Sequence, residues 1–281
     1  MSQSFQRICI LGGGLLGGSI AFALREKADV RLWLRKPSAI APARELGFGN
    51  ATDSLADAVS GANLLILAVP VGAMPELLSA AVEAGLPTDC LVTDVGSVKQ
   101  APHQALAPII SGSGNPFIGS HPMAGSERNG LGAARADLFE NAACLLTNDS
   151  GASEELCAAL AGFWEKLGCR ISWFGAAEHD GLVARISHLP HLVAAATAKV
   201  ALKDTSAGAF GGGGLRDTTR VAAGNPDMWA EILTENREAV IPALTETIAE
   251  LREILASLER PDQEQAHRWL AEAKTLRDTL P

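Results

Sequence analysis

Short hydrophobic segments alternate with longer amphipathic segments over the first 174 residues of the chain. This alternation predicts strands separated by helices, which is typical of an α/β fold with a parallel sheet. The strands are expected at Arg7–Leu11, Val30–Leu34, Leu64–Val69, Leu91–Thr93, Phe117–Gly119, Ala143–Thr147 and Arg170–Phe174.

The pattern becomes entirely helical from Glu178 onward. One helix is expected from about Glu178 to Lys203, followed by a loop at Gly211–Gly214 and by further helices. We therefore place a boundary near Ala176, which gives a doubly wound domain at 1–175 and an all-helical domain at 176–281.

The longest of these helices repeats apolar residues at spacings of three and four, which predicts a buried stripe. The stripe comprises Val240, Leu244, Ile248, Leu251, Leu255 and Leu258. It is expected either to form the interface of a homodimer or to pack within its own subunit, and the sequence leaves both open.

Composition narrows the class of protein. The 281 residues carry a formal net charge of -9 with only 23 Lys and Arg, which argues against a nucleic-acid partner. The apolar stretch around Leu64 to Val71 is much shorter than the roughly 20 residues of a membrane helix, and residues 1–10 contain no signal-peptide core. We expect a cytoplasmic protein without a membrane partner.

Two residue counts bear on the chemistry. The chain has no Tyr, so a mechanism in which a phenol donates the proton is excluded. Its five cysteines are an odd number without a CxxC pair, which indicates reduced, buried thiols and not a metal site.

A glycine-rich turn follows the first predicted strand and precedes a helix. In this context Gly12 permits the tight turn, Gly14 lets the backbone approach a pyrophosphate, and Gly17 allows the helix to pack on the strand. Leu15 and Leu16 begin the helix whose N-terminus attracts the anion. With Val69 at the end of a neighbouring predicted strand, these residues predict a dinucleotide site.

The end of the second predicted strand indicates which dinucleotide binds. A carboxylate there would bind the ribose 2′-hydroxyl of NAD, but the sequence places Arg35 and Lys36 after Leu34. Two cations suit a 2′-phosphate, so we predict a preference for NADP over NAD. The alternative is that both cations merely lie in a solvated loop.

His121 is the candidate proton acceptor, because it follows a predicted strand at the edge where ligands of open α/β sheets bind. His103, His179 and His267 are interpreted as surface or structural residues. His188 and His191 share one helical face, and we expect one of them to contact substrate or cofactor and the other to support the helix. Pro190 should kink that helix.

Arg216 and Arg220 follow the four-glycine loop and suit a carboxylated substrate, because guanidinium groups form bidentate pairs with carboxylates. The alternative for one of them is an ion pair with Asp217 or another acid.

Several segments together resemble the prephenate/arogenate dehydrogenase family of tyrosine biosynthesis over nearly the whole chain. They are Gly12–Ser19, Asp94–Lys99 (DVGSVK), Gly119–Glu127 (GSHPMAGSE), Ser187–His191 (SHLPH), the Arg220 segment and Asn225–Trp229 (NPDMW).

The resemblance implies a Rossmann domain followed by a helical dimerisation domain, and an oxidative decarboxylation of a cyclohexadienyl acid. It implies that His121 takes the proton of the ring hydroxyl as hydride passes to the nicotinamide. It further implies that Ser97 orients that hydroxyl, that Arg220 binds a carboxylate, and that His191 contacts substrate or nicotinamide. Ser126, Glu127 and Trp229 would line the pocket.

Three other interpretations remain open. A β-hydroxyacid dehydrogenase would share the plan and use a helical lysine such as Lys199, although the SHPMAG segment is then unexplained. A non-catalytic NADP-binding protein would bind cofactor without turnover, and an interaction module would assign no role to Arg220. The sequence does not decide between prephenate and arogenate, nor whether tyrosine inhibits.

Overall fold

The fold is seen in a computed structural model that describes residues 5–125, 130–260 and 262–280. Ser126 and Glu127, two predicted pocket residues, lie outside these ranges. The chain divides into two compact units, residues 1–236 and residues 237–281.

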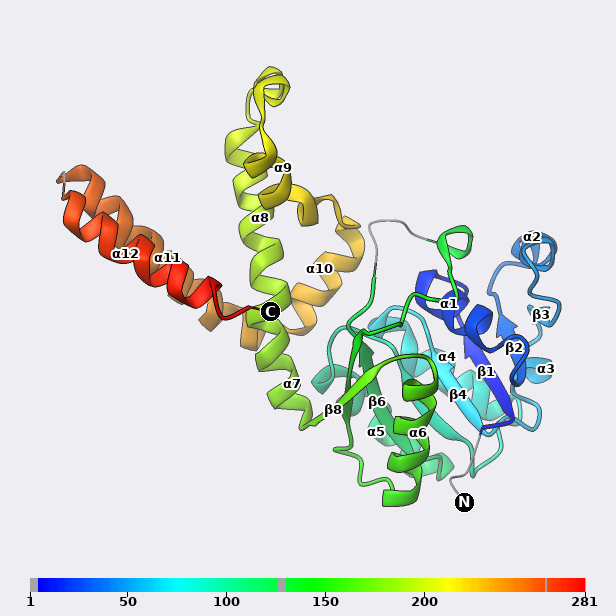
Figure 1. Cartoon of the computed structure of the whole chain (residues 1–281). Helices are drawn as coiled ribbons and strands as arrows, with labels where there is room; N and C mark the ends of the chain where they lie inside the picture. The colour runs from blue at the N-terminus through cyan, green and yellow to red at the C-terminus, as the bar shows by residue number, and fades with distance from the viewer. Residues whose placement is uncertain (1–4, 126–129, 261, 281) are drawn as a thin grey trace. The chain divides into compact units, whose positions relative to one another are not determined.

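The first unit is built on one eight-stranded sheet with the order β3-β2-β1-β4-β5-β6-β7-β8 (Figure 1). The strands are β1 Arg7–Leu11, β2 Asp29–Trp33, β3 Ala51–Thr52, β4 Leu64–Leu67, β5 Leu91–Asp94, β6 Phe117–Pro122, β7 Ala143–Thr147 and β8 Arg170–Phe174. All neighbouring pairs are parallel except β6 and β7, which are antiparallel. The predicted strands are therefore present, but the last two, β7 and β8, run opposite to the others instead of completing the expected parallel sheet, and β3 was not predicted.

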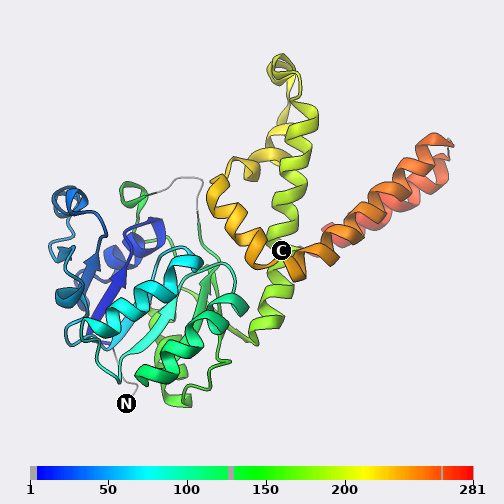
Figure 2. The same ribbon diagram turned by 180° about the vertical axis from the view of Figure 1, so that it is seen from behind.

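Alternate residues of the central strands point to opposite faces of the sheet, and both faces are buried. Ile8 and Ile10 of β1 pack on one side, whereas Cys9 and Leu11 pack on the other. Helices α1 (Leu15–Leu24), α2 (Ile40–Glu45) and α6 (Glu154–Lys166) cover the first side. Helices α3 (Leu55–Val59), α4 (Met74–Glu83) and α5 (Gln100–Ser113) cover the second, and Figure 2 shows α4 and α5 in front of the sheet.

This arrangement defines where a ligand binds. The strand order reverses between β1 and β4, and the crevice outside the carboxyl ends of the strands at such a reversal is the ligand site of doubly wound folds. The Gly12–Gly17 turn follows β1 there, and the parallel pairing from β1 through β6 brings His121 to the same edge of the sheet.

The helices that follow the sheet begin two residues earlier than predicted and are interrupted. Helix α7 (Ala176–Val183) continues through one π-helical turn, η4 (Ala184–His188), into α8 (Leu189–Ala201). The sequence predicts a kink at Pro190, and the structure has a π-helical turn that ends two residues before this proline. Short elements η5 (Thr205–Phe210), α9 (Gly213–Thr219), η6 (Arg220–Ala223) and α10 (Pro226–Glu235) complete the first unit.

The second unit is a pair of helices, α11 (Arg237–Glu259) and α12 (Gln263–Arg277), lying side by side in both views. Trp269 Nε1 on α12 donates a hydrogen bond of 2.9 Å to Glu250 on α11. The predicted stripe on α11 is largely exposed within the single chain: Leu251 is 54% exposed and Leu258 66%. Val240 is buried and Leu244 half-buried, so the two residues at the start of the stripe are covered within the chain, whereas the residues from Ile248 onward are exposed. No helix in the described ranges is both long and apolar enough to cross a membrane.

Candidate active site

The glycine-rich turn adopts a backbone that only glycine tolerates at two of its positions. Gly12 has a φ of 118°, and a Cβ added to it would lie 2.3 Å from the carbonyl oxygen of Ala68. A Cβ on Gly17 would lie 2.1 Å from the carbonyl oxygen of Gly12, so α1 packs on the turn without any side chain between them. Val69, a predicted cofactor residue, lines the same turn, with its Cγ1 3.0 Å from the position of a Cβ on Gly12.

Gly14 differs, because no atom of the described residues lies within 4 Å of the position that its Cβ would take. It is the N-cap of α1 and no side chain caps the helix, so the first-turn amides that begin at Leu15 and Leu16 have no side-chain acceptor. An open approach to uncapped helix amides is the geometry that binds a phosphate anion. The turn therefore fits the pyrophosphate of a dinucleotide.

The end of β2 carries the two predicted cations. The Leu34 side chain is buried against Gly13, and the chain then turns outward at Arg35 and Lys36, which are both exposed. One acid that the sequence interpretation did not weigh is nearby: Asp53 follows β3, which pairs with β2, and its carbonyl oxygen accepts a 3.0 Å hydrogen bond from Trp33 Nε1.

A buried network fixes the strand that carries His121. Asp94, at the end of β5, accepts hydrogen bonds from the amides of Gly96 (2.8 Å) and Ser120 (3.2 Å) and pairs with the ammonium group of Lys99. Both members of this ion pair are fully buried. The DVGSVK segment thus ties the loop after β5 to the residue that precedes His121, and Ser97 lies half-buried in that loop.

His121 is 7% exposed, and its partner is a second imidazole. His121 Nδ1 lies 2.9 Å from His179 Nε2, and His179 Nδ1 lies 2.8 Å from Asp180 Oδ1. The sequence predicts a surface or structural role for His179; it lies 58 residues from His121 in the chain, and only the fold brings the two rings together. Its one sequence signal is the Asp180 that follows it.

Electrostatics favour the neutral form of His121. Burial lowers its pKa well below 6.5, and His179, Lys99 and His188 lower the pKa further. Burial raises the pKa of Asp180, but hydrogen bonds from His179 and from the amides of Gln100 and Lys99 outweigh it, so that pKa lies below its ordinary value. The site therefore contains a neutral base and an ionised carboxylate at neutral pH.

His188 supplies a buried polar atom without a partner. The Asn236 side-chain amide donates to the carbonyl oxygen of Asp180 (2.9 Å) and lies 3.1 Å from His188 Nδ1. Burial lowers the pKa of His188 to about 4, so the ring is neutral and carries its proton on Nε2. That buried nitrogen has no partner among the described residues, which is how a donor directed at a ligand appears in a structure without one.

His191 and Trp229 form the next part of the site. Their rings stack with centroids 3.6 Å apart and an interplanar angle of 11°, and Trp229 also meets His188 edge-on at 6.0 Å. A Cβ on Gly224 would lie 2.4 Å from Trp229 Nε1, so that glycine is required for the stack. The structure therefore places His191 and Trp229 beside His188.

The two predicted carboxylate-binding arginines are exposed. Arg216 lies on α9 and Arg220 begins η6, which packs against α8. In the parts of the chain that the structure describes, neither guanidinium has an acidic partner within 4.0 Å, Asp217 included. Both remain available to an anion.

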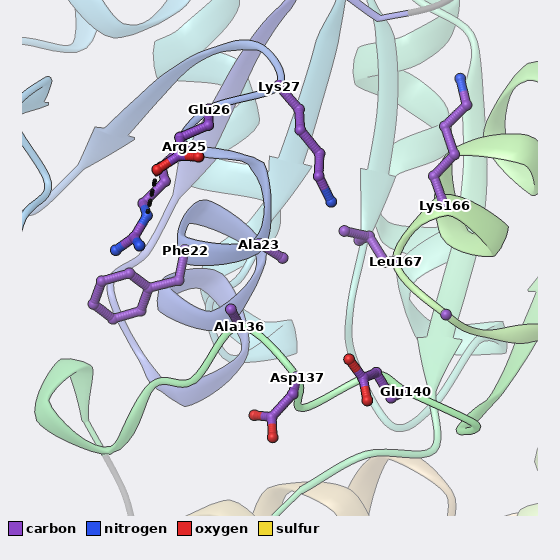
Figure 3. Close-up of a pocket in the computed structure, with 11 residues that line it drawn as sticks. Phe22, Ala23, Arg25, Glu26, Lys27, Ala136, Asp137, Glu140, Lys166 and Leu167 are labelled. Carbon is purple, nitrogen blue, oxygen red and sulfur yellow. Dashed lines mark ion pairs between the residues drawn. The ribbon is translucent and has the colours of Figure 1, made fainter.

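A separate hollow of about 380 Å³ lies between the end of α1, residues 136–140 and the end of α6 (Figure 3). Its charged side chains are partly matched, since Arg25 pairs with Glu26 at 3.8 Å and Asp137 pairs with Arg135 at 2.6 Å. It shares no lining residue with the glycine-rich turn or the histidine cluster.

Comparisons with known proteins show the family of this chain. Residues 20–173 match the family described as prephenate dehydrogenase, nucleotide-binding domain, and residues 175–272 match prephenate dehydrogenase, dimerization domain. A cyclohexadienyl dehydrogenase of Zymomonas mobilis is 36% identical over 272 residues, which is 92% of this chain and 90% of the relative.

Two solved structures share the whole fold. Prephenate dehydrogenase from Aquifex aeolicus, in complex with hydroxyphenyl propionate and NAD+, has a TM-score of 0.88 and 30% identity and covers 99% of both chains. Synechocystis arogenate dehydrogenase has a TM-score of 0.81 and 31% identity, over 96% of this chain and 98% of that one.

Proposed function

This chain belongs to the prephenate dehydrogenase family, and from that premise we propose that it oxidatively decarboxylates prephenate, arogenate or both with NAD(P). The observation that carries the proposal is a buried, neutral His121 at the same edge of the sheet as a glycine-rich turn that fits a pyrophosphate. This combination, with similarity over the whole chain, supports the interpretation over a β-hydroxyacid dehydrogenase, which leaves the SHPMAG segment unexplained.

The residues act on the substrate in distinct ways. The nicotinamide ring, when bound, supplies the hydride acceptor. His121 takes the proton of the ring hydroxyl while hydride leaves the same carbon, and Ser97 orients that hydroxyl. Loss of the ring carboxylate as CO₂ makes the ring aromatic, which favours the step.

Other residues bind and enclose the substrate. Arg220, with Arg216, pairs with a substrate carboxylate, because an exposed guanidinium without an acid partner is available for a bidentate contact. His191 and Trp229 stack beside His188, whose buried Nε2–H has no partner among the described residues and is available to the substrate. We propose Ser126 and Glu127 as pocket residues because they belong to the SHPMAGSE segment, which resembles the family.

We further propose that the chain prefers NADP. The support is that Arg35 and Lys36 are exposed after β2 and that the strand itself ends without a carboxylate. Asp53 is the competing feature, because an acid beside the strand end is what an NAD site would use.

The proposed assembly is a homodimer formed through the C-terminal helices. It is supported by the match to a dimerization domain and by the apolar residues that α11 exposes, among them Ile248 and Leu255. We place the domain boundary at residues 175 and 176. A cytoplasmic location suits the five free cysteines.

The decisive experiment measures turnover of prephenate and of arogenate, each with NAD and with NADP. We expect NAD(P)H formation with at least one substrate, and a higher kcat/KM with NADP than with NAD. Cofactor binding without turnover of either substrate would reject the enzyme, and a large preference for NAD would reject the cofactor assignment alone.

A further inference from the structure

A line of three buried side chains extends from His121 into the protein. It runs through His179, which has no exposed surface, to Asp180, which also has none. The line joins the end of β6 to helix α7, and both contacts are within hydrogen-bonding distance, at 2.9 and 2.8 Å.

The donors and acceptors along this line determine the tautomer of each ring. Asp180 accepts from the backbone amides of Lys99 (2.8 Å) and Gln100 (2.9 Å), and as an ionised carboxylate it can only accept. His179 Nδ1 must therefore carry a hydrogen, which leaves Nε2 of the neutral ring with its lone pair. His121 Nδ1 must then donate to that lone pair, which leaves His121 Nε2 unprotonated.

We propose that Asp180 and His179 form a proton relay with His121, in which His179 takes the Nδ1 proton of His121 while His121 Nε2 takes the hydroxyl proton of the substrate. Asp180 and His179 are thus positioning residues for the base. The inference rests on the proposed function, because it assigns His121 the role of proton acceptor.

The substrate O–H bond breaks as His121 Nε2–H forms, and the His121 Nδ1–H bond breaks as His179 Nε2–H forms. Hydride leaves the ring carbon with its electron pair, and the pair of the bond to the departing CO₂ completes the aromatic ring and leaves a phenolate. The phenolate regains a proton through the same line in reverse, so both rings return to their starting tautomers and no net proton is released.

The charges around the two rings explain why the proton moves inward. Burial disfavours a positive charge on His121, and His179, Lys99 and His188 disfavour it further. Burial, and then Lys99, lower the pKa of His179 as well, but the carboxylates of Asp180 and Asp94 raise it, and no carboxylate does so for His121. A positive charge is therefore better placed on His179, in contact with Asp180, than on His121.

Two variants and a control test the relay in the full-length protein. In Asp180→Asn, the amide can donate to His179 and reverse both tautomers, so we expect kcat to fall by about 10²–10⁴ with little change in KM. In His179→Gln, the amide oxygen still accepts from His121 Nδ1 but cannot take up a proton, so we expect the tautomer of His121 to be kept while kcat still falls. His103→Gln removes another buried imidazole, one bonded to Ser150 and Thr147, and should leave kcat essentially unchanged.

The second readout is independent of turnover. Nitrogen-15 NMR of histidine-labelled protein, assigned with single His→Gln variants, should show His121 and His179 protonated on Nδ1 at neutral pH. A His121 ring protonated on Nε2, or an active wild type whose kcat is unchanged in Asp180→Asn and His179→Gln, would overturn the relay. A wild type that turns over neither substrate would reject the proposed function instead. The NMR spectrum would still show which nitrogen of His121 and of His179 carries the proton.

Discussion

Gly14→Ala separates cofactor binding from folding at the glycine-rich turn. Gly14 has φ -78° and ψ -168°, an extended conformation open to any residue, and nothing lies within 4 Å of an added Cβ. Losing glycine at an N-cap costs about 0.5–1 kcal/mol, and the reduced freedom of the unfolded chain returns about 0.4–1 kcal/mol. We expect the free energy of unfolding to change by less than about 1 kcal/mol.

The effect on the cofactor should be much larger. The added methyl group occupies the open approach to the first-turn amides of α1, where the pyrophosphate would accept charge-assisted hydrogen bonds. Losing one such bond costs about 1.5–3 kcal/mol, which is a roughly 10- to 150-fold increase in Kd. Calorimetric titration with NADP and NAD measures this increase, and urea unfolding measures stability.

Gly17→Ala is the matched control, because its Cβ would lie 2.1 Å from the Gly12 carbonyl oxygen and the helix must shift. Such overpacking costs about 1–3 kcal/mol of stability or more, so this variant should lose stability as well as affinity. If Gly14→Ala folds normally and binds both cofactors with the wild-type Kd, then Gly14 does not face a pyrophosphate and the cofactor site is misassigned.

Three further predictions concern stability, pH and cofactor choice. Lys99→Met leaves the buried Asp94 carboxylate without its cation and should cost about 3–5 kcal/mol in urea unfolding; a loss below about 1 kcal/mol would contradict the role of the pair. Because the pKa of His121 is depressed, its neutral form persists below pH 6.5, so kcat/KM should stay level as pH falls through 6.5 and decline only at lower pH, where the ring gains a proton. A decline centred above 6.5 would count against His121 as the base. Arg35→Ser should raise the KM for NADP roughly 10-fold or more and leave that for NAD nearly unchanged, as expected for the loss of one charged hydrogen bond; equal effects on both would remove Arg35 from the 2′-phosphate site.

Much of the fold follows from local pattern, and the exceptions have physical causes. β1 and β4 are continuous apolar runs because both their faces are buried. β3 has only two residues, which is too few to show a period. The reversal of β7 and β8 could not be predicted, because a strand has the same side-chain pattern in either direction.

The residues of the candidate site fall into two groups: those that a local motif predicts and those that only the fold brings together. Gly12, Gly14 and His121 were predictable because a motif places each directly at a strand end. His179, Asp180 and Asn236 were not, because their roles arise from contacts between elements far apart in the sequence. The α11 stripe shows a third limit: amphipathic spacing predicts an apolar face but not which molecule covers it.

The π-helical turn at Ala184–His188 determines in which direction around the helix axis the side chains of α8 point. Leu189 donates to the carbonyl oxygen of Ala184, five residues back, so this turn holds one residue more than an α-helical turn. Each residue rotates an α-helix by about 100°, so removing one residue here would turn His191 away from the direction it now takes relative to His179. Chain length between the two histidines is therefore as much a part of the active site as the histidines themselves.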